Sequence, residues 1–184
     1  MADNNSFSYN IAFTLAVNDA KAETLLTPKE LWQGIKRGGR NPNDFAPYVD
    51  RCEVLSGGHK QFRRKLILAD GAVHTAAGES LVQDVLIADM LHVEATTVAS
   101  GAKSTFLFSY DAADGKDEKD LYLTAMYELK MDGMEPGSPA AMKIETDYRQ
   151  LAKGACASAV SSIRLWKEQG LLAKWAKEDE TLEG

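Results

Sequence analysis

Large hydrophobic and small or polar residues alternate near the start of the chain. Between Tyr9 and Asn18, large apolar side chains occupy every second position. A period of two is typical of a β-strand with one buried face. Further apolar segments follow, bounded by glycine, aspartate or polar stretches, and such tight connections favour antiparallel neighbours. We predict these strands at Cys52–Leu55, Gln61–Leu68, Glu79–Ile87, Leu91–Val98, Ser104–Tyr110 and Leu121–Met131.

Two short helical segments are predicted between the first strand and the second. Thr27 can cap the first of them, Pro28 suits its first position, and Glu30 can reach back to the cap amide. We expect this helix to end at the glycine pair at 38–39. A second short helix or turn is expected from Pro42 to Val49.

A long amphipathic helix is predicted near the end of the chain. Ser138 can cap it, Pro139 suits its first position, and Gly170 is expected to end it. Residues 152–162 are almost all small, which either lets the helix pack closely on the sheet or leaves room for a ligand beneath it. A last helical turn is expected over residues 171–175. The apolar face repeats every three to four residues and comprises Ile144, Tyr148, Leu151, Ala155, Ala159, Ile163 and Trp166.

The composition is that of an ordinary globular chain. Of its 184 residues, 45% are hydrophobic and 26% are charged, and no linker divides them. We therefore predict a single domain over residues 7–176, with a disordered leader at 1–6 and a frayed tail at 177–184. The two cysteines, Cys52 and Cys156, are too few for a disulfide framework and are expected to be buried thiols.

The formal net charge of -6 disfavours binding to nucleic acid or to an anionic membrane surface. The first residues lack the apolar core of a secretory signal, and no apolar run is long enough to span a membrane. We therefore expect a cytoplasmic protein without stable membrane insertion, whose partner is a small neutral or weakly charged molecule. The sequence does not indicate an oligomeric state.

Standard catalytic signatures are missing from the sequence. It contains no Gly-x-Ser-x-Gly elbow, phosphate-binding loop or dinucleotide fingerprint. His59, His74 and His92 lack metal-ligand spacing. The acidic stretch at 111–120 lacks the ligand pattern of a calcium loop and is expected to be a hairpin tip. We predict no metal and no cofactor. We expect His92 to point outward, although an inward His92 beside Glu94 would form an acid/base pair.

The chemistry of Arg64 conflicts with its predicted position. It shares a strand face with three apolar residues, Phe62, Leu66 and Leu68. A buried arginine is rare unless it is paired. Two interpretations are open: the guanidinium points inward, where antiparallel pairing offers Gln83 or Asp84 as the nearest partner, or it reaches solvent. Beside the neutral Gln83, an inward Arg64 would keep hydrogen-bond donors for a ligand.

The order of predicted elements is a strand, two short helices, six antiparallel strands and one long helix. This order resembles the helix-grip fold of the SRPBCC superfamily, which includes the START lipid-transfer domains, the major birch-pollen allergens and the polyketide cyclases. Within it, the chain looks most like the AtaL-like branch, a domain of unknown function, from about Phe7 to Trp166. The motifs that carry the resemblance are Leu26–Gly34 (LTPKELWQG), Arg40–Pro42 before Phe45, Cys52–Leu55, Arg64 before Leu66, and Leu121–Thr124.

The resemblance implies an α+β fold in which a curved antiparallel seven-stranded sheet wraps around a long C-terminal helix. Two residues depart from the pattern of this branch. Gln83 stands where an acidic residue is expected, and Ala125 stands where a bulky aromatic is expected. Both lie on faces predicted to point inward. Ala125 and the small residues of the helix therefore predict an internal cavity, on the order of some hundreds of cubic ångströms.

The resemblance further implies that the cavity binds a small hydrophobic or aromatic metabolite. It leaves open whether the protein also transforms this ligand. A catalytic member would carry out a cofactor-independent cyclisation, dehydration or isomerisation in secondary metabolism, in the manner of a polyketide cyclase. Arg64, with Tyr127 or Tyr148, would then stabilise an enolate-like oxygen.

Two non-enzymatic alternatives are a carrier or storage protein for a lipid or metabolite, and a chaperone-associated domain. For Tyr110, Tyr127 and Tyr148, packing within the core is the alternative to ligand contact. The expected ligand-binding residues are Phe13, Phe62, Arg64, Gln83, Phe106, Phe108, Tyr110, Leu123, Ala125, Tyr127, Tyr148, Ala155 and Ala159.

Overall fold

The computed structural model describes residues 6–72, 76–110 and 120–183. Within these residues, seven strands form one antiparallel sheet in the order β1-β7-β6-β5-β4-β3-β2. The strands are β1 (Ser6–Ala16), β2 (Val49–Gly57), β3 (Gln61–Leu68), β4 (Ser80–Ala88), β5 (His92–Thr97), β6 (Lys103–Tyr110) and β7 (Leu121–Asp132). The helices are α1 (Pro28–Arg40), the short 3-10 helix η1 (Pro42–Asp44), α2 (Pro139–Glu168) and α3 (Leu171–Glu183). The predicted α+β helix-grip class is confirmed.

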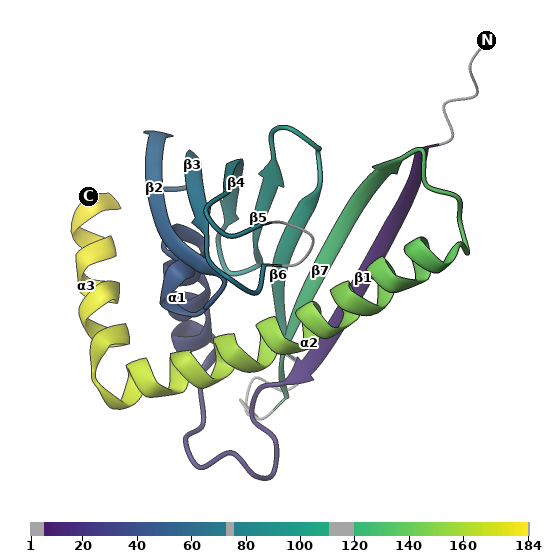
Figure 1. Ribbon diagram of the computed structural model, residues 1–184. Coiled ribbons are helices and arrows are strands. Elements are labelled where there is room, and N and C mark those ends of the chain that lie inside the picture. Colours follow the sequence, from purple (N-terminus) through teal and green to yellow (C-terminus); the bar gives the residue numbers. More distant parts are fainter. Residues whose placement is uncertain (1–5, 73–75, 111–119, 184) are drawn as a thin grey trace.

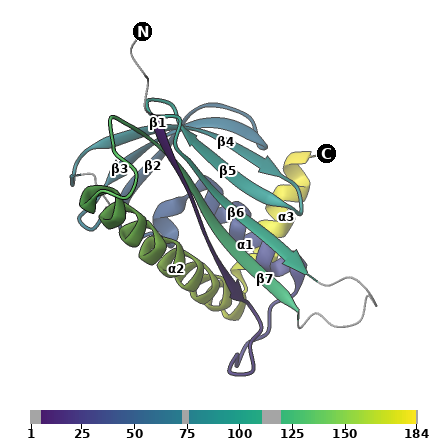
Figure 2. The same ribbon diagram turned by 90° about the vertical axis from the view of Figure 1, so that its right-hand side faces the viewer.

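The sheet is curved, and α1 and α2 lie on its concave face (Figures 1 and 2). Strands β1 and β2 form its opposite edges, so α1 and η1 carry the chain from one edge to the other. On β3, the side chains of Phe62, Arg64, Leu66 and Leu68 are buried on this face, and the residues between them are exposed or half-buried. The alternation of the sequence thus sets which side of each strand meets the helices.

Helix α2 packs closely on β1 and β7 through its smallest residues. Ala152, Cys156 and Ala159 have no exposed surface. The Sγ atom of Cys156 lies 3.5 Å from the carbonyl oxygen of Phe13 and 3.6 Å from that of Leu123. Such contacts with backbone atoms need small side chains at the interface. On this face of α2, the small residues serve close packing.

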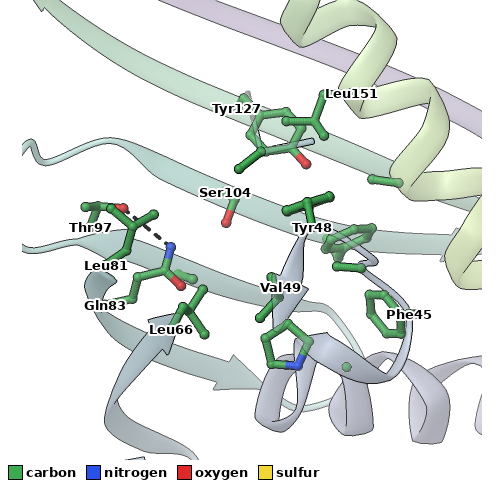
Figure 3. Close-up of a pocket in the computed structure, with 18 of the residues that line it drawn as sticks. Phe45, Tyr48, Val49, Leu66, Leu81, Gln83, Thr97, Ser104, Tyr127 and Leu151 are labelled. Atoms are coloured by element: carbon green, nitrogen blue, oxygen red, sulfur yellow. Dashed lines mark hydrogen bonds between the residues drawn. The ribbon is translucent and has the colours of Figure 1, made fainter. Parts of the chain in front are cut away.

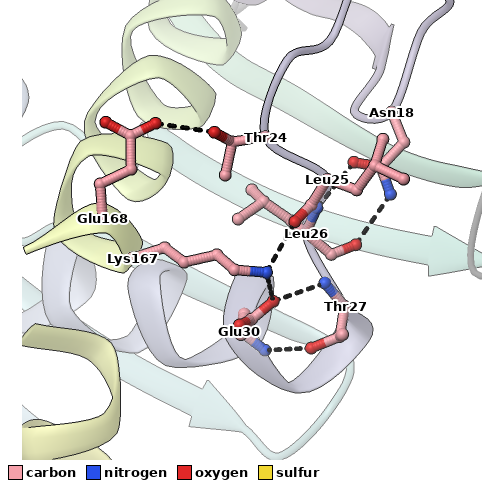
Figure 4. Close-up of polar contacts among 8 residues, drawn as sticks. All are labelled: Asn18, Thr24, Leu25, Leu26, Thr27, Glu30, Lys167 and Glu168. Carbon is pink, nitrogen blue, oxygen red and sulfur yellow. Dashed lines mark hydrogen bonds and ion pairs between the residues drawn. The ribbon is translucent and has the colours of Figure 1, made fainter. Parts of the chain in front are cut away.

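A polar network ties the start of α1 to the end of α2 (Figure 4). The predicted capping box is present: the Glu30 amide donates to Thr27 Oγ1 at 3.2 Å, and the Thr27 amide donates to Glu30 Oε2 at 2.8 Å. Lys167 donates to Glu30 Oε2 and to the Leu25 carbonyl, both at 2.8 Å. Partial burial favours the neutral acid, but the hydrogen bonds from Lys167 and Thr27 lower the pKa of Glu30 below its usual value. Helix α1 is thereby anchored at its N-terminus.

The glycine pair at 38–39 does not end α1 as expected. The helix continues to Arg40, and both glycines are buried. A Cβ atom at Gly38 would lie 1.7 Å from a ring carbon of Phe45, and one at Gly39 would lie 2.7 Å from Val93 Cγ1. These glycines therefore permit close packing of α1 instead of stopping it.

Helix α3 is longer than the single turn expected after Gly170. It continues through residue 177, where a frayed tail was expected, to Glu183. Asp179 accepts hydrogen bonds from Gln33 and Lys36 of α1. None of the described helices is long and apolar enough to cross a membrane. His74 and residues 111–119 of the acidic stretch lie outside the described residues.

Candidate ligand-binding site

A cavity of about 440 Å³ lies between the helices and the concave face of the sheet. Its walls are the C-terminal part of α1, the segment at 42–49, strands β3 to β7 and the middle of α2. Phe45, Val49, Leu66, Leu81 and Leu151 contribute apolar surface from different sides (Figure 3). The volume and the mainly apolar lining are typical of small-molecule sites.

A polar row crosses the sheet at this cavity. The strand registers place Arg64 of β3 opposite Gln83 of β4, and Gln83 opposite Thr97 of β5. The Nε and Nη2 atoms of Arg64 donate to Gln83 Oε1 at 3.0 and 2.8 Å. Gln83 Nε2 lies 3.4 Å from Thr97 Oγ1 (Figure 3). Arg64 is 6% exposed. Of the two interpretations of Arg64, the inward one is observed, and its partner is the amide of Gln83.

Arg64 has a second neutral partner at the end of α1. Its Nη1 atom donates to the carbonyl oxygen of Gly39, which lies in the last turn of that helix. The C-terminal end of a helix carries a partial negative charge, so it favours a cation. Burial lowers the pKa of Arg64 to about 10, while Cys52 and Tyr48 oppose the shift. The guanidinium is therefore charged at neutral pH.

Tyrosine side chains meet beside Arg64. The rings of Tyr127 and Tyr148 contact each other edge to face, with centroids 5.5 Å apart. Burial raises the pKa of Tyr48, but a hydrogen bond with Tyr127 and the charge of Arg64 partly oppose this. The pKa of Tyr127 is raised well above its usual value, first by burial and then by Tyr48. The pKa of Tyr148 is raised, mainly by burial. All three hydroxyls are protonated at neutral pH. One proton of the Tyr48–Tyr127 pair is used in the hydrogen bond between them, which leaves the other for a ligand.

Tyr48 and Phe45 were not predicted as site residues. They belong to the segment at 42–49, which has no hydrophobic period from which the direction of a side chain can be derived. Tertiary contacts set their positions: Ser158 of α2 donates to the Phe45 carbonyl at 2.7 Å, and Arg37 forms an ion pair with Asp44 at 2.7 Å. The available signal was a pair of aromatic residues in a proline-containing segment.

The structure brings part of the predicted ligand-binding set to the cavity. The predicted residues that line it are Arg64, Gln83, Phe106, Tyr127, Tyr148 and Ala155. Others lie in the core beneath the helices, away from the cavity: Phe62, Phe108, Leu123, Ala125 and Ala159. Phe13 is half-buried against this core. Tyr110 is 47% exposed and stacks on Phe108 at the end of β6. Only some of the side chains on the inward faces of the strands therefore line the cavity, and the helices cover most of the others.

The alternative inward orientation of His92 is not observed. Val93 and Ala95 are the buried residues of β5, so His92 and Glu94 lie on the other face of the sheet. Glu94 forms an ion pair with Lys103 at 3.3 Å. Among the described residues, no group of three or more His, Cys, Asp or Glu side chains is arranged to hold a metal ion. Burial raises the pKa of Cys156 to about 11, which makes it a protonated core thiol.

Comparison with known proteins gives a match that includes the whole cavity. The family model described as Acetylaranotin biosynthesis cluster protein L (AtaL) matches residues 11–170. The protein of that name from Aspergillus terreus is 42% identical over 172 residues, which cover 92% of this chain and 97% of the relative. The resemblance to the AtaL-like branch is therefore confirmed, and this chain belongs to the AtaL family.

Proposed function

We propose that the protein binds a small hydrophobic or aromatic metabolite in the cavity between α1, α2 and the sheet, as part of the biosynthesis of a natural product. The cavity carries the proposal, because a volume of about 440 Å³ with apolar walls suits a ligand of this size and kind. The name of the Aspergillus relative, which refers to a biosynthesis cluster, supports the metabolic setting.

A few polar groups would fix the orientation of the ligand. Arg64 and the hydrogen-bonded pair of Tyr48 and Tyr127 offer donors in a mainly apolar space. An oxygen atom of the ligand placed there would accept several hydrogen bonds, while rings or alkyl groups fill the remainder. The ligand is therefore expected to be amphipathic, with its oxygen end towards Arg64.

The catalytic form of this function is a cofactor-independent cyclisation, dehydration or isomerisation. Arg64 would stabilise negative charge on an enolate-like oxygen, as donors aimed at a developing charge do in other enzymes. Tyr127 and Tyr148 would supply or accept a proton through their hydroxyls, and Tyr48 is added to them by its contact with Tyr127. Because their pKa values are raised, these tyrosines are protonated at neutral pH, so donation of a hydrogen bond is the role that fits them and proton abstraction is not.

A second candidate is a carrier that binds the metabolite without changing it. The charged residues of the described lining are Arg64 and Lys103, and this lining includes no Asp, Glu, His or Cys. A general base for proton abstraction at neutral pH would thus have to come from the ligand or from water. This chemistry favours the carrier over an enzyme that begins with proton removal.

Binding in the cavity can be tested with a fluorescent apolar ketone, 6-propionyl-2-dimethylaminonaphthalene. Ala155 lines the cavity from α2, and Ala157 is exposed on the same helix. Ala155→Trp is expected to fill the space and abolish the blue shift of the bound dye, whereas Ala157→Trp leaves it unchanged. Equal dye binding in both variants, with both folded by circular dichroism, would refute the proposal.

Metabolite profiles of the source organism separate the enzyme from the carrier. Deletion of an enzyme predicts accumulation of a precursor with the elemental formula of the missing product, or with one additional water. Deletion of a carrier predicts lower yield of an unchanged set of compounds. Complementation with Arg64→Met is expected to reproduce the deletion profile under either function, because both depend on binding.

A further inference from the structure

We infer that the ligand of the cavity is an anion, and that its ionised acidic oxygen supplies the counter-charge of Arg64. The inference rests on the proposed function and adds the charge of the ligand to it. It also replaces the expectation of a neutral or weakly charged partner, which was based on the net charge of the whole chain.

Three carboxylates on the elements that line the cavity already have basic partners. Asp84 is bonded to Arg63 at 2.6 Å, and Glu94 pairs with Lys103 at 3.3 Å. On the segment that carries Tyr48, Asp44 pairs with Arg37 at 2.7 Å. Arg64 is buried, yet the described residues that accept its hydrogen bonds are the amide of Gln83 and the carbonyl of Gly39. Arg64 and Lys103 both line the cavity, and among the described residues only Lys103 has a carboxylate partner.

The protein compensates this charge in part. The C-terminal end of α1, which holds Arg64 through Gly39, is equivalent to about half a negative charge. Tyr48 and Cys52, which lie near Arg64, are neutral at pH 7, because burial raises the pKa of each. The lowered pKa of Arg64 is in keeping with a cation that its surroundings do not fully stabilise. A positive charge therefore remains in the wall of the cavity.

The site also has the donors that an anionic oxygen needs. A guanidinium has five N–H groups, and Arg64 gives three of them to Gln83 and Gly39. The other two N–H groups make no hydrogen bond to any of the described residues and remain for a ligand. The Tyr48 hydroxyl, close enough to Arg64 for the guanidinium to oppose the rise of its pKa, adds another donor. A carboxylate, or an acidic phenol or enol in its ionised form, fits this set better than a neutral carbonyl does.

Matched aromatic probes test the charge directly. 2-Naphthoate and 2-naphthamide have nearly the same shape, but only the first is an anion at pH 7. Titration calorimetry of the wild-type protein is expected to give at least about tenfold tighter binding of 2-naphthoate, the ratio that a charged hydrogen bond supplies. Equal affinities, or a preference for the amide, would overturn the inference and leave apolar binding in the cavity standing.

Variants show which arginine is responsible. Arg64→Met is expected to reduce 2-naphthoate affinity at least tenfold and 2-naphthamide affinity less than threefold. Arg63→Met removes the same charge from the next residue on the outer face and is expected to change both by less than twofold. If Arg64→Met does not fold, Gln83→Glu serves instead, because its carboxylate would occupy Arg64 and remove the preference for the anion.

The outcomes separate the two proposals. A preference for 2-naphthoate that persists in Arg64→Met or in Gln83→Glu would refute the role of Arg64 as the anion partner. Binding of both probes at wild-type affinity to Ala155→Trp would place them outside the cavity, which overturns the proposed function and this inference together.

Discussion

The paired strands β3 and β4 carry two arginines side by side, and the two faces of the sheet treat them differently. On the outer face, Arg63 lies opposite Asp84 and binds its carboxylate with two hydrogen bonds of 2.6 and 2.8 Å. On the inner face, Arg64 lies opposite Gln83 and binds a neutral amide oxygen. The same residue type thus has a charged partner in solvent and an uncharged partner in the interior.

This difference is the reverse of what stability alone would select. Exposed ion pairs contribute little, because water already stabilises both charges. A buried guanidinium gains far more from a carboxylate, since breaking or omitting such a pair leaves a charge in a medium of low polarity. The neutral partner therefore sits where it is most costly. A position that gives up stability in this way is typical of a functional site.

The largest expected difference between the two arginines is in stability. Arg64→Met leaves the oxygens of Gln83 and Gly39 buried without their donor, which is expected to lower the free energy of unfolding by about 1–3 kcal/mol. Arg63→Met removes only a solvent-exposed pair and is expected to leave the urea midpoint nearly unchanged. Urea denaturation of both variants measures this. Equal shifts of the two midpoints would show that the arginines on the two faces of the sheet contribute equally to stability, contrary to this prediction.

Gln83→Glu would make the inner pair resemble the outer one. The introduced carboxylate would add an attraction between opposite charges to the existing hydrogen bonds, so the variant is expected to gain about 1 kcal/mol at pH 7 after the cost of burying the carboxylate. The introduced acid, beside Arg64, has a folded pKa below its unfolded value of about 4.3. Its contribution is therefore present at pH 7 and is lost as the pH falls below about 4. Urea titrations at pH 7 and pH 3.5 measure both effects, with Gln83→Leu as the uncharged control.

The smallest expected effect concerns Asp84. The hydrogen bonds from Arg63 lower the pKa of this carboxyl, so its stabilising contribution is present above about pH 4 and is lost as the pH falls through the lowered folded pKa. The slight difference between wild type and Arg63→Met should therefore vanish in acid. The difference between wild type and Arg64→Met should persist over the same range, because Gln83 does not titrate. A loss of both differences in acid would contradict the assigned pairing.

Alternation and register gave the inner pair as one of two interpretations. The period of two in β3 allowed an inward Arg64, and antiparallel pairing offered Gln83 or Asp84 as its neighbour; the structure selects the inward orientation and Gln83. The order of elements and the caps at Thr27 and Ser138 followed from local chemistry in the same way. These features depend on neighbours in the chain or on adjacent strands, so a single sequence contains them.

The extent of the cavity did not follow from these patterns. Alternation shows that Phe108 and Leu123 point inward, but not that the helices cover them while Phe106 stays open to the cavity. Ala125 likewise leaves no space, because α2 approaches closely at Cys156. The distance between a helix and a sheet depends on every contact along both elements, and no short motif specifies it.

The glycines of α1 have a consequence for the order in which the protein folds. This helix of 13 residues contains three glycines, each of which lowers helix stability by about 1 kcal/mol relative to alanine. Gly34 and Gly38 allow contacts with Ile163 and Phe45 that exist only after α2 and the segment at 42–49 are in place. The isolated segment is therefore a poor helix former, and α1 becomes helical as it docks. Its last turn supplies the carbonyl that holds Arg64, so the binding site is complete only when α1 has docked.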